Sequence, residues 1–172
     1  MKKFQLFIAV ALFGMTFAVA QDVSFAATAG YVSGHQKVES AGFEASGSES
    51  GVFVGGLADI AVSDKFHVQP ELVFSAISDF NSLTMPIMAK FYVADSFNLQ
   101  AGPTLNYVLE ESGDETTNFG ILVGGGAGYD FGDKWFAQAR YNFQINDYYT
   151  GDASDTSNKI NMLTIGVGYK FN

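Results

Sequence analysis

Hydrophobic and polar residues alternate along eight stretches of the chain. In residues 135–146 the odd positions carry apolar side chains, while the even positions carry mainly Gln, Asn and Arg. Successive side chains of a β-strand point to opposite faces, so each stretch predicts a strand with one apolar and one polar face. The eight expected strands cover residues 23–32, 52–62, 66–76, 83–93, 99–109, 119–131, 135–146 and 163–171.

Short turns and longer polar connections alternate between these strands. Asp64, Asp95 and Asp133 each lie at the centre of an expected three-residue turn of one repeated design. The longer polar connections are residues 34–50, 77–82, 110–116 and 147–158. Tight turns on one side and variable loops on the other are typical of membrane β-barrels. The pattern predicts an all-β fold, an eight-stranded antiparallel up-and-down transmembrane barrel.

The start of the chain predicts a signal peptide. Lys2 and Lys3 precede the apolar run of residues 7–13, and residues 18–20 provide small side chains for cleavage near Ala20. The expected organisation is a signal peptide at residues 1–20 and one barrel domain at residues 21–172. A membrane anchor is the alternative, but the apolar run is short for a helix that must span about 20 residues.

Composition excludes several functions. Subtracting Lys2 and Lys3 from the 9 basic residues leaves 7 against 18 acidic residues, a net charge of −11. Nucleic acid is therefore not an expected partner, because its phosphates require a basic face. Cysteine is absent, which excludes disulfides, thiol catalysis and cysteine-ligated metals. We expect no cofactor and no metal site.

The polar faces of the strands carry few charges, and these charges are balanced. They are Asp59, Glu71, Asp130, Lys90, Arg140 and Lys170. A soluble lipocalin-like barrel would turn its apolar face inward, but a face of Gly, Asn, Gln and Thr is a poor coat against water. Balanced ions suit a closed interior, because an unpaired buried charge is costly. We therefore expect these six residues to form a polar network in the lumen.

The expected register refines this network. A turn centred on Asp133 would place Gly126 opposite Arg140 and Gly124 opposite Asn142, so that glycines make room for larger side chains. The turn centred on Asp95 sets Lys90 beside Gln100. We expect Glu71, Lys90 and Arg140 to block the lumen, since eight strands leave room only for side chains and not for an open pore.

Three prolines lie inside expected strands, at positions 70, 86 and 103. Proline removes a donor from the hydrogen-bond ladder. Because a closed barrel has no edge strand to accommodate it, we expect a bulge or a locally missing bond near each proline.

The chain resembles the small outer-membrane barrels of Bacteroidetes that are related to the PorT protein. The resemblance is carried by residues 68–75 (VQPELVFS), 85–92 (MPIMAKFY), 101–103 (AGP), 139–142 (ARYN) and 166–171 (GVGYKF). It implies the barrel fold and the outer membrane of a Gram-negative cell. It also implies a C-terminal signal for the outer-membrane assembly machinery, formed by Thr164, Gly166, Tyr169 and Phe171 and followed by Asn172.

The resemblance leaves the function open. We expect a small non-porin barrel with polar acidic surface loops and a structural or surface-binding role. It would be a monomer in contact with outer-membrane lipid and lipopolysaccharide, and an envelope protein or surface ligand could bind its long loops. A PorT-like accessory of a secretion system is the alternative, while a lipid acyl-chain enzyme or a soluble lipocalin-like binder is less favoured.

No enzymatic site is expected. Ser33, His35 and Glu39 supply the residue types of a nucleophile, a base and an orienting acid, but such a site is defined by geometry. His67 is expected to be a hydrogen-bonded interior residue. Tyr148 and Tyr149 could form a surface for stacking a ligand.

Acidic residues cluster in two of the long loops. They are Glu110, Glu111, Asp114 and Glu115 in one loop and Asp147, Asp152 and Asp155 in the other. Neither cluster has the spacing of an EF-hand, so a solvated loop is favoured over a calcium site.

The outward aromatic residues are expected to form two girdles at the membrane interfaces. Phe66, Phe97 and Trp135 would lie on the turn side, and Tyr31, Phe74, Tyr107 and Phe143 on the loop side.

Overall fold

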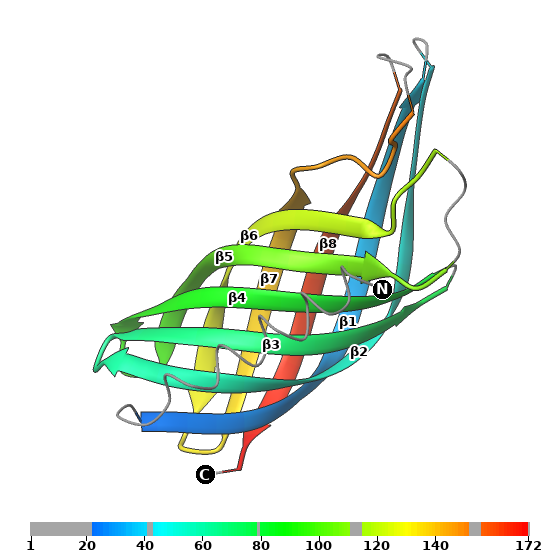
Figure 1. The fold of residues 1–172 in the computed structure, drawn as a ribbon. Coiled ribbons are helices and arrows are strands. Elements are labelled where there is room, and N and C mark those ends of the chain that lie inside the picture. The colour runs from blue at the N-terminus through cyan, green and yellow to red at the C-terminus, as the bar shows by residue number, and fades with distance from the viewer. Residues whose placement is uncertain (1–21, 41–42, 79, 111–114, 152–155, 172) are drawn as a thin grey trace.

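The computed structural model describes residues 22–40, 43–78, 80–110, 115–151 and 156–171. Eight antiparallel strands close into a barrel, each paired with its neighbours in the sequence, while β1 pairs with β8 (Figure 1). The strands are β1 (Asp22–Ser40), β2 (Phe43–Ser63), β3 (Phe66–Ile77), β4 (Asn81–Ala94), β5 (Phe97–Val108), β6 (Phe119–Phe131), β7 (Trp135–Gln144) and β8 (Thr156–Lys170). The predicted up-and-down barrel is confirmed.

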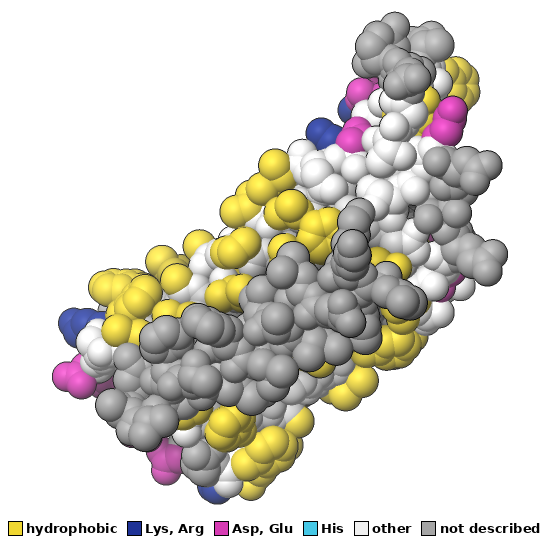
Figure 2. Space-filling model, viewed as in Figure 1, with side chains coloured by type: hydrophobic (Ala, Val, Ile, Leu, Met, Phe, Trp, Pro, Cys, Tyr) yellow, Lys and Arg dark blue, Asp and Glu magenta, His cyan; other side chains and the backbone are white. Residues whose placement is uncertain are grey.

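The two faces of each strand follow the predicted alternation. Polar side chains that point inward are buried, including Gln69, Asn98 and Asn106, each about 1% exposed. Apolar side chains that point outward are exposed, and Figure 2 shows them over the body of the barrel with charged side chains towards its ends. All seven aromatic residues expected in the girdles are exposed. This inside-out distribution is what a barrel surrounded by lipid requires.

The predicted pairing of residues is confirmed in two pairs of strands. Gly126 lies opposite Arg140 and Gly124 opposite Asn142 in the β6–β7 pair. Lys90 lies opposite Gln100 in the β4–β5 pair.

Two of the three turns differ from the predicted three-residue design. The β6–β7 connection has the expected length, with Phe131 opposite Trp135 and Gly132 at a φ of 73°. In the other two, Ser63 pairs with Phe66 and Ala94 with Phe97, so Asp64 and Asp95 lie in two-residue turns. The register shifts just before each of these turns, which is how a β-bulge accommodates the extra residue.

The first long loop was predicted wrongly, because most of it is strand. The β1–β2 ladder continues without a register shift to the pair Ser40–Phe43, and β8 pairs with β1 as far as Thr156. These segments are rich in Ser, Gly, Lys and Glu and lack the apolar alternation of a lipid-facing strand. Their backbones nevertheless pair, and Figure 1 shows them projecting beyond the end of β3.

The ladder is interrupted beside each proline. The β2–β3 ladder is interrupted at Pro70 of β3, the β3–β4 ladder at Pro86 of β4 and the β4–β5 ladder at Pro103 of β5. Each ladder resumes in the same register. The prediction of a locally missing bond is confirmed, and the unchanged register means that no bulge is needed there.

No helix in the described part of the chain has the length and apolar character needed to cross a membrane. The expected signal peptide at residues 1–20 lies outside the described residues. So do Glu111, Asp114, Asp152 and Asp155 of the acidic loops.

Candidate functional sites: the filled lumen and the loop end

Arg140 forms an ion pair with Glu71 across the lumen. The Arg140 Nη2 atom, on β7, lies 2.6 Å from the Glu71 Oε1 atom on β3, and their side chains are 4% and 1% exposed. Arg140 also donates to the side-chain oxygens of Gln100 on β5 and Gln138 on β7. The guanidinium therefore ties three strands together and shares its charge with three acceptors, as a buried cation requires.

Lys90 pairs with a different carboxylate. Its Nζ atom lies 2.6 Å from the Asp59 Oδ2 atom, and His67 Nδ1 lies 2.7 Å from Asp59 Oδ1. The expected cluster of Glu71, Lys90 and Arg140 is thus split into two ion pairs. Asp59 and Lys90 come from β2 and β4, on either side of the strand that carries His67, so Asp59 links three strands.

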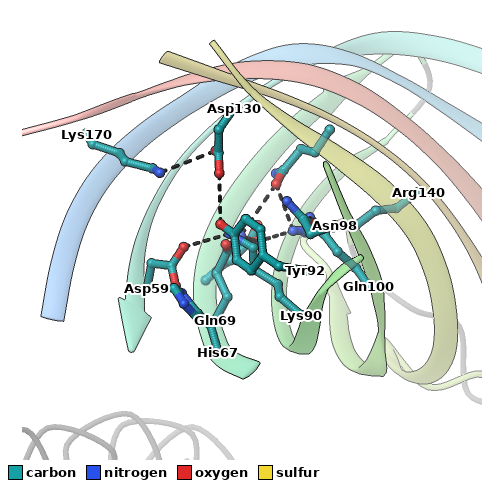
Figure 3. A network of polar contacts seen from close by, with 12 residues as sticks. Asp59, His67, Gln69, Lys90, Tyr92, Asn98, Gln100, Asp130, Arg140 and Lys170 are labelled. Carbon is teal, nitrogen blue, oxygen red and sulfur yellow. Dashed lines mark hydrogen bonds and ion pairs between the residues drawn. The ribbon is translucent and has the colours of Figure 1, made fainter. Parts of the chain in front are cut away.

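A third polar group lies towards the turns. Asp130 accepts a hydrogen bond from the Tyr92 hydroxyl at 2.8 Å and forms an ion pair with Lys170 at 3.3 Å. The rings of Tyr92 and His67 lie 4.9 Å apart, which joins this group to the Asp59 pair (Figure 3). The structure therefore places all six predicted charged residues in the interior as three pairs of opposite charge.

The neutral partners of Glu71 and Arg140 were not predicted from the sequence. Gln69 donates to Glu71 at 2.5 Å, while Gln100 and Gln138 accept from Arg140. All three occupy inward positions, so strand parity was the signal that could have identified them. Tyr92, which also points inward, was overlooked because it directly follows the outward Phe91.

Glycines in β6 make the space for these side chains. A β-carbon placed on Gly126 would lie 2.0 Å from the Ala139 carbonyl oxygen and 2.8 Å from the Arg140 Cγ atom. One placed on Gly124 would lie 2.1 Å from the Asn142 Oδ1 atom. The absence of a side chain at these positions lets Arg140 and Asn142 cross the lumen.

An apolar cluster closes the loop end of the lumen. Its buried members are Val32, Phe53, Val73, Ile77, Leu122, Tyr148, Ile160 and Met162. Tyr148, in the β7–β8 connection, is only 4% exposed, and its hydroxyl accepts a hydrogen bond from Asn106 at 2.7 Å. The suggestion that Tyr148 forms an exposed stacking surface is therefore wrong. Burial raises the pKa of this phenol and the hydrogen bond from Asn106 partly offsets that rise, so the hydroxyl is neutral at ordinary pH.

The interior leaves little free space beside Arg140. A cavity of about 30 Å³ is bordered by Glu71, Thr104 and Asn142. A larger pocket of about 500 Å³ opens at the turn end and is lined by His67, Tyr92 and Asp130. The polar network lies between this pocket and the apolar cluster, so the lumen is filled in the way that an eight-stranded barrel allows.

The residues considered for an enzymatic site are not brought together as a triad. His35 Nδ1 contacts the hydroxyl of Ser48 at 2.9 Å, whereas Glu39 pairs with Lys37 at 2.5 Å. Hydrogen bonds to Glu39 and Glu44 raise the pKa of Lys37, which lies in the part of β1 that projects beyond the end of β3. The described contact of Glu39 is thus the ion pair with Lys37.

Acidic side chains at the loop end of the barrel accept hydrogen bonds from backbone amides of neighbouring segments. Glu110 accepts from the Asn81 amide nitrogen at 2.6 Å, and Asp147 accepts from the Asn158 amide nitrogen at 2.7 Å. Among the described residues, no group of three or more His, Cys, Asp or Glu could hold a metal ion.

Three residues of the expected assembly signal lie in β8, and the fourth, Phe171, directly follows it. Thr164 and Gly166 point inward, and Tyr169 and Phe171 point outward with 36% and 60% exposure. Tyr169 packs edge-on against Trp135, with ring centroids 5.0 Å apart. The outward pair therefore continues the aromatic surface of the turn side.

Comparison with solved structures finds the same architecture in small outer-membrane barrels. The attachment invasion locus protein Ail of Yersinia pestis matches with a TM-score of 0.52 and 14% identity, over 87% of this chain and 99% of that one. Neisserial surface protein A matches with a TM-score of 0.51 and 21% identity, over the same shares of the two chains. At this level of identity the likeness concerns the fold. No curated protein sequence matches the chain.

A family model settles the relationship that the architecture suggests. The model described as "Outer membrane protein beta-barrel domain" matches residues 83–172, which is more than half of the chain. The matched segment runs from β4 to the end of β8 and contains four of the six lumen charges. With its lipid-compatible exterior and filled interior, the chain belongs to the outer membrane protein β-barrel family.

Proposed function

We propose that the protein is a non-porin surface barrel that holds a stiff acidic sheet above the outer membrane to bind a partner. The observation that carries the proposal is the unbroken β1–β2 ladder, which continues to Ser40 and Phe43 although β3 ends at Ile77. Residues 43–50 of β2 would extend roughly 25 Å at about 3.3 Å per residue. We call the part formed by residues 33–40, 43–50 and 156–163 the extension.

The orientation follows from the lengths of the connections. Outer-membrane barrels keep short turns on the periplasmic side and longer segments outside the cell. The two-residue and three-residue turns are all at the end opposite the extension. By this rule the extension lies outside the cell, above the girdle that contains Tyr31 and Phe143.

The filled lumen supports a scaffold rather than a channel. Three ion pairs and an apolar cluster occupy the interior, so transport through the barrel has no path in this arrangement. A rigid barrel of this kind suits a platform, because it limits the motion of the strands that project from it. The outward apolar band contacts lipid, and the base of the extension reaches the level of lipopolysaccharide.

The charge at the loop end favours a cationic partner. Its described acidic residues are Glu39, Glu44, Glu49, Glu110, Glu115 and Asp147, and its described lysines are Lys37 and Lys159. Such an imbalance attracts positively charged partners and repels acidic ones.

Shortening the extension tests the proposal. Replacing residues 36–47 by an Asn-Gly turn would join His35 to Ser48, which already face each other, through a two-residue hairpin. We expect the variant to fold and to run as a heat-modifiable band, but to lose the surface partners that a photo-crosslinker at Ser48, an exposed residue present in both proteins, captures in the native protein. A crosslinker at Asp133, on the opposite end, is the control position.

A variant that keeps the phenotype and the surface interactions of the native protein would contradict the surface-binding role. If deleting the protein instead leaves secreted cargo in the periplasm, and the shortened variant restores its export, the role is that of a secretion accessory.

Export and assembly complete the proposal. Cleavage after Ala20 would leave a mature chain that starts at Gln21, which mass spectrometry of the purified protein can test. Phe171 is the outward aromatic residue nearest the end of β8, and Phe171→Ala should lower the amount of assembled barrel in the outer membrane.

A further inference from the structure

The extension has one covered edge and one open edge. Beyond the barrel, β1 lies in the middle, with β8 on one side and β2 on the other. The outer edge of β8 is covered: Tyr148 donates to the Asn158 carbonyl, and Asn158 and Ile160 donate to the side chains of Asp147 and Gln144. Within the described residues, no such bonds cover β2 between Glu44 and Ser48.

The direction of the free backbone groups can be assigned. The Ser50 carbonyl accepts from the Ser78 amide and hydroxyl, so the backbone of Ser50 faces the side of β3. In a regular strand this direction alternates from residue to residue. Because the β1–β2 register has no shift in this region, Glu44, Ser46 and Ser48 also present their N–H and C=O groups to the open side.

We propose that residues 44–48 of β2 form a docking edge, which binds an extended segment of a partner protein that carries basic side chains. An exposed strand edge is a template for an added strand, with main-chain hydrogen bonds for affinity and side chains for selectivity. The inference rests on the proposed surface-binding function and names the kind of partner.

The surroundings of the docking edge select this partner. Glu44 is the first residue of the edge and Glu49 directly follows it, and residues 43–48 are all exposed. Phe43 at the tip is 76% exposed, the largest exposed fraction among the large hydrophobic side chains of the described residues, and it offers an apolar contact beside the edge. Pairing between the β2 edges of two copies would bring four glutamates to one seam, so the acidic edge disfavours self-association.

The test uses the full protein in nanodiscs and a nine-residue peptide that alternates lysine and valine. On binding, we expect amide exchange to slow by at least tenfold at Glu44, Ser46 and Ser48. Exchange at Ala45 and Gly47, which face β1, should stay as it was. A peptide that alternates glutamate and valine is the charge control and should bind at least tenfold more weakly.

Two variants separate the backbone from the side chain. Ser46→Pro removes the N–H at the open edge, and Ser46→Ala removes only the hydroxyl. We expect the lysine peptide to bind Ser46→Pro at least tenfold more weakly than Ser46→Ala. The double variant Glu44→Gln, Glu49→Gln should weaken binding and reduce its dependence on salt. Circular dichroism and gel mobility verify that each variant is folded.

Several results would overturn the docking edge. They are equal binding by the two Ser46 variants, unchanged exchange at the three open-edge amides, or a dimer that forms through this edge. If no peptide binds while the shortened extension still loses its crosslinked surface partners, strand pairing is wrong and the surface-binding function stands.

Discussion

Arg140 joins three strands of the barrel through its side chain. Its guanidinium reaches Glu71 on β3, Gln100 on β5 and Gln138 on its own strand. A charge in this position depends on its partners, because water cannot replace them in a filled lumen.

Arg140→Ala should destabilise the barrel by about 3–5 kcal/mol, because it leaves the Glu71 carboxylate buried without its cation. Urea-induced unfolding in detergent measures the change. Lys134→Ala, at an exposed turn, is the matched control and should unfold like the native protein. Equal unfolding midpoints for Arg140→Ala and the native protein would show that the ion pair does not support the fold.

A substitution at Gly126 tests whether the barrel wall has room for a side chain at this position. Gly126→Ala should cost about 1–3 kcal/mol, since the added β-carbon would meet the backbone of β7 at 2.0 Å. In Gly56→Ala the nearest atom to the new β-carbon lies at 3.9 Å, so this control should stay near native stability. Thermal unfolding monitored by gel mobility compares the two, and equal losses would contradict the close fit at Gly126.

At this scale, sequence patterns predicted the position of Arg140 but not all of its partners. The pairing of Gly126 with Arg140 follows from counting residues across one turn. The contact between Lys90 and Asp59 joins β4 to β2, which are not adjacent, so it depends on how the closed wall curves around His67.

At the scale of elements, the ladders of three neighbouring strand pairs, β2–β3, β3–β4 and β4–β5, are each interrupted. We call these three interruptions together the seam. The interruptions lie at residues 58–59 of β2, 71–72 of β3 and 87–88 of β4, each opposite a proline. Their position was predictable, because proline lacks the donor that the ladder needs.

The seam should exchange its amide protons faster than the opposite wall. In each of the segments 58–59, 71–72 and 87–88, one of the two residues directs its backbone N–H and C=O groups towards the interruption. We therefore expect at least one amide proton in each segment to exchange fast. The matched reference is β7 at residues 137–141, which is paired on both sides. Hydrogen exchange followed by NMR gives the comparison, and uniform protection across both walls would contradict the interruption.

Turn length and strand length differed from the sequence-based prediction for physical reasons. A two-residue turn with a bulge and a three-residue turn occupy the same number of residues, so the sequence around Asp64 and Asp95 does not distinguish between the two. The extension was missed because apolar alternation marks contact with lipid, whereas residues 34–40 and 43–50 pair in water.

At the scale of the whole molecule, a broad apolar surface surrounds a polar interior. Exposed side chains such as Phe74, Val123 and Phe143 would be unfavourable in water, and they are stable when lipid covers them. The charged residues gather in the lumen and at the two ends.

This distribution predicts the behaviour of the protein in membranes. We expect it to remain in the membrane fraction after alkaline extraction and to migrate faster on a gel when unboiled, because the closed barrel resists detergent. A boiled sample of the same preparation is the control. Release in soluble form would mean that the apolar face does not contact lipid.

Conductance measures whether the lumen is filled. In planar lipid bilayers the native protein should show no steady porin-sized current, since side chains occupy an eight-stranded interior. The shortened extension should behave the same way, because the ion pairs lie within the barrel. A sustained current from the native protein would contradict the filled lumen.

The sequence by itself determined the number of strands, their order and the face that each one turns to lipid. These are local properties, because alternation within one strand and the spacing of turns need no knowledge of distant residues. Only the tertiary structure decided which charges meet in the lumen, that Tyr148 folds back over its mouth, and that β2 continues beyond β3 with an open edge. These features arise when the sheet closes, since closure brings non-adjacent strands together and leaves any longer strand without a neighbour.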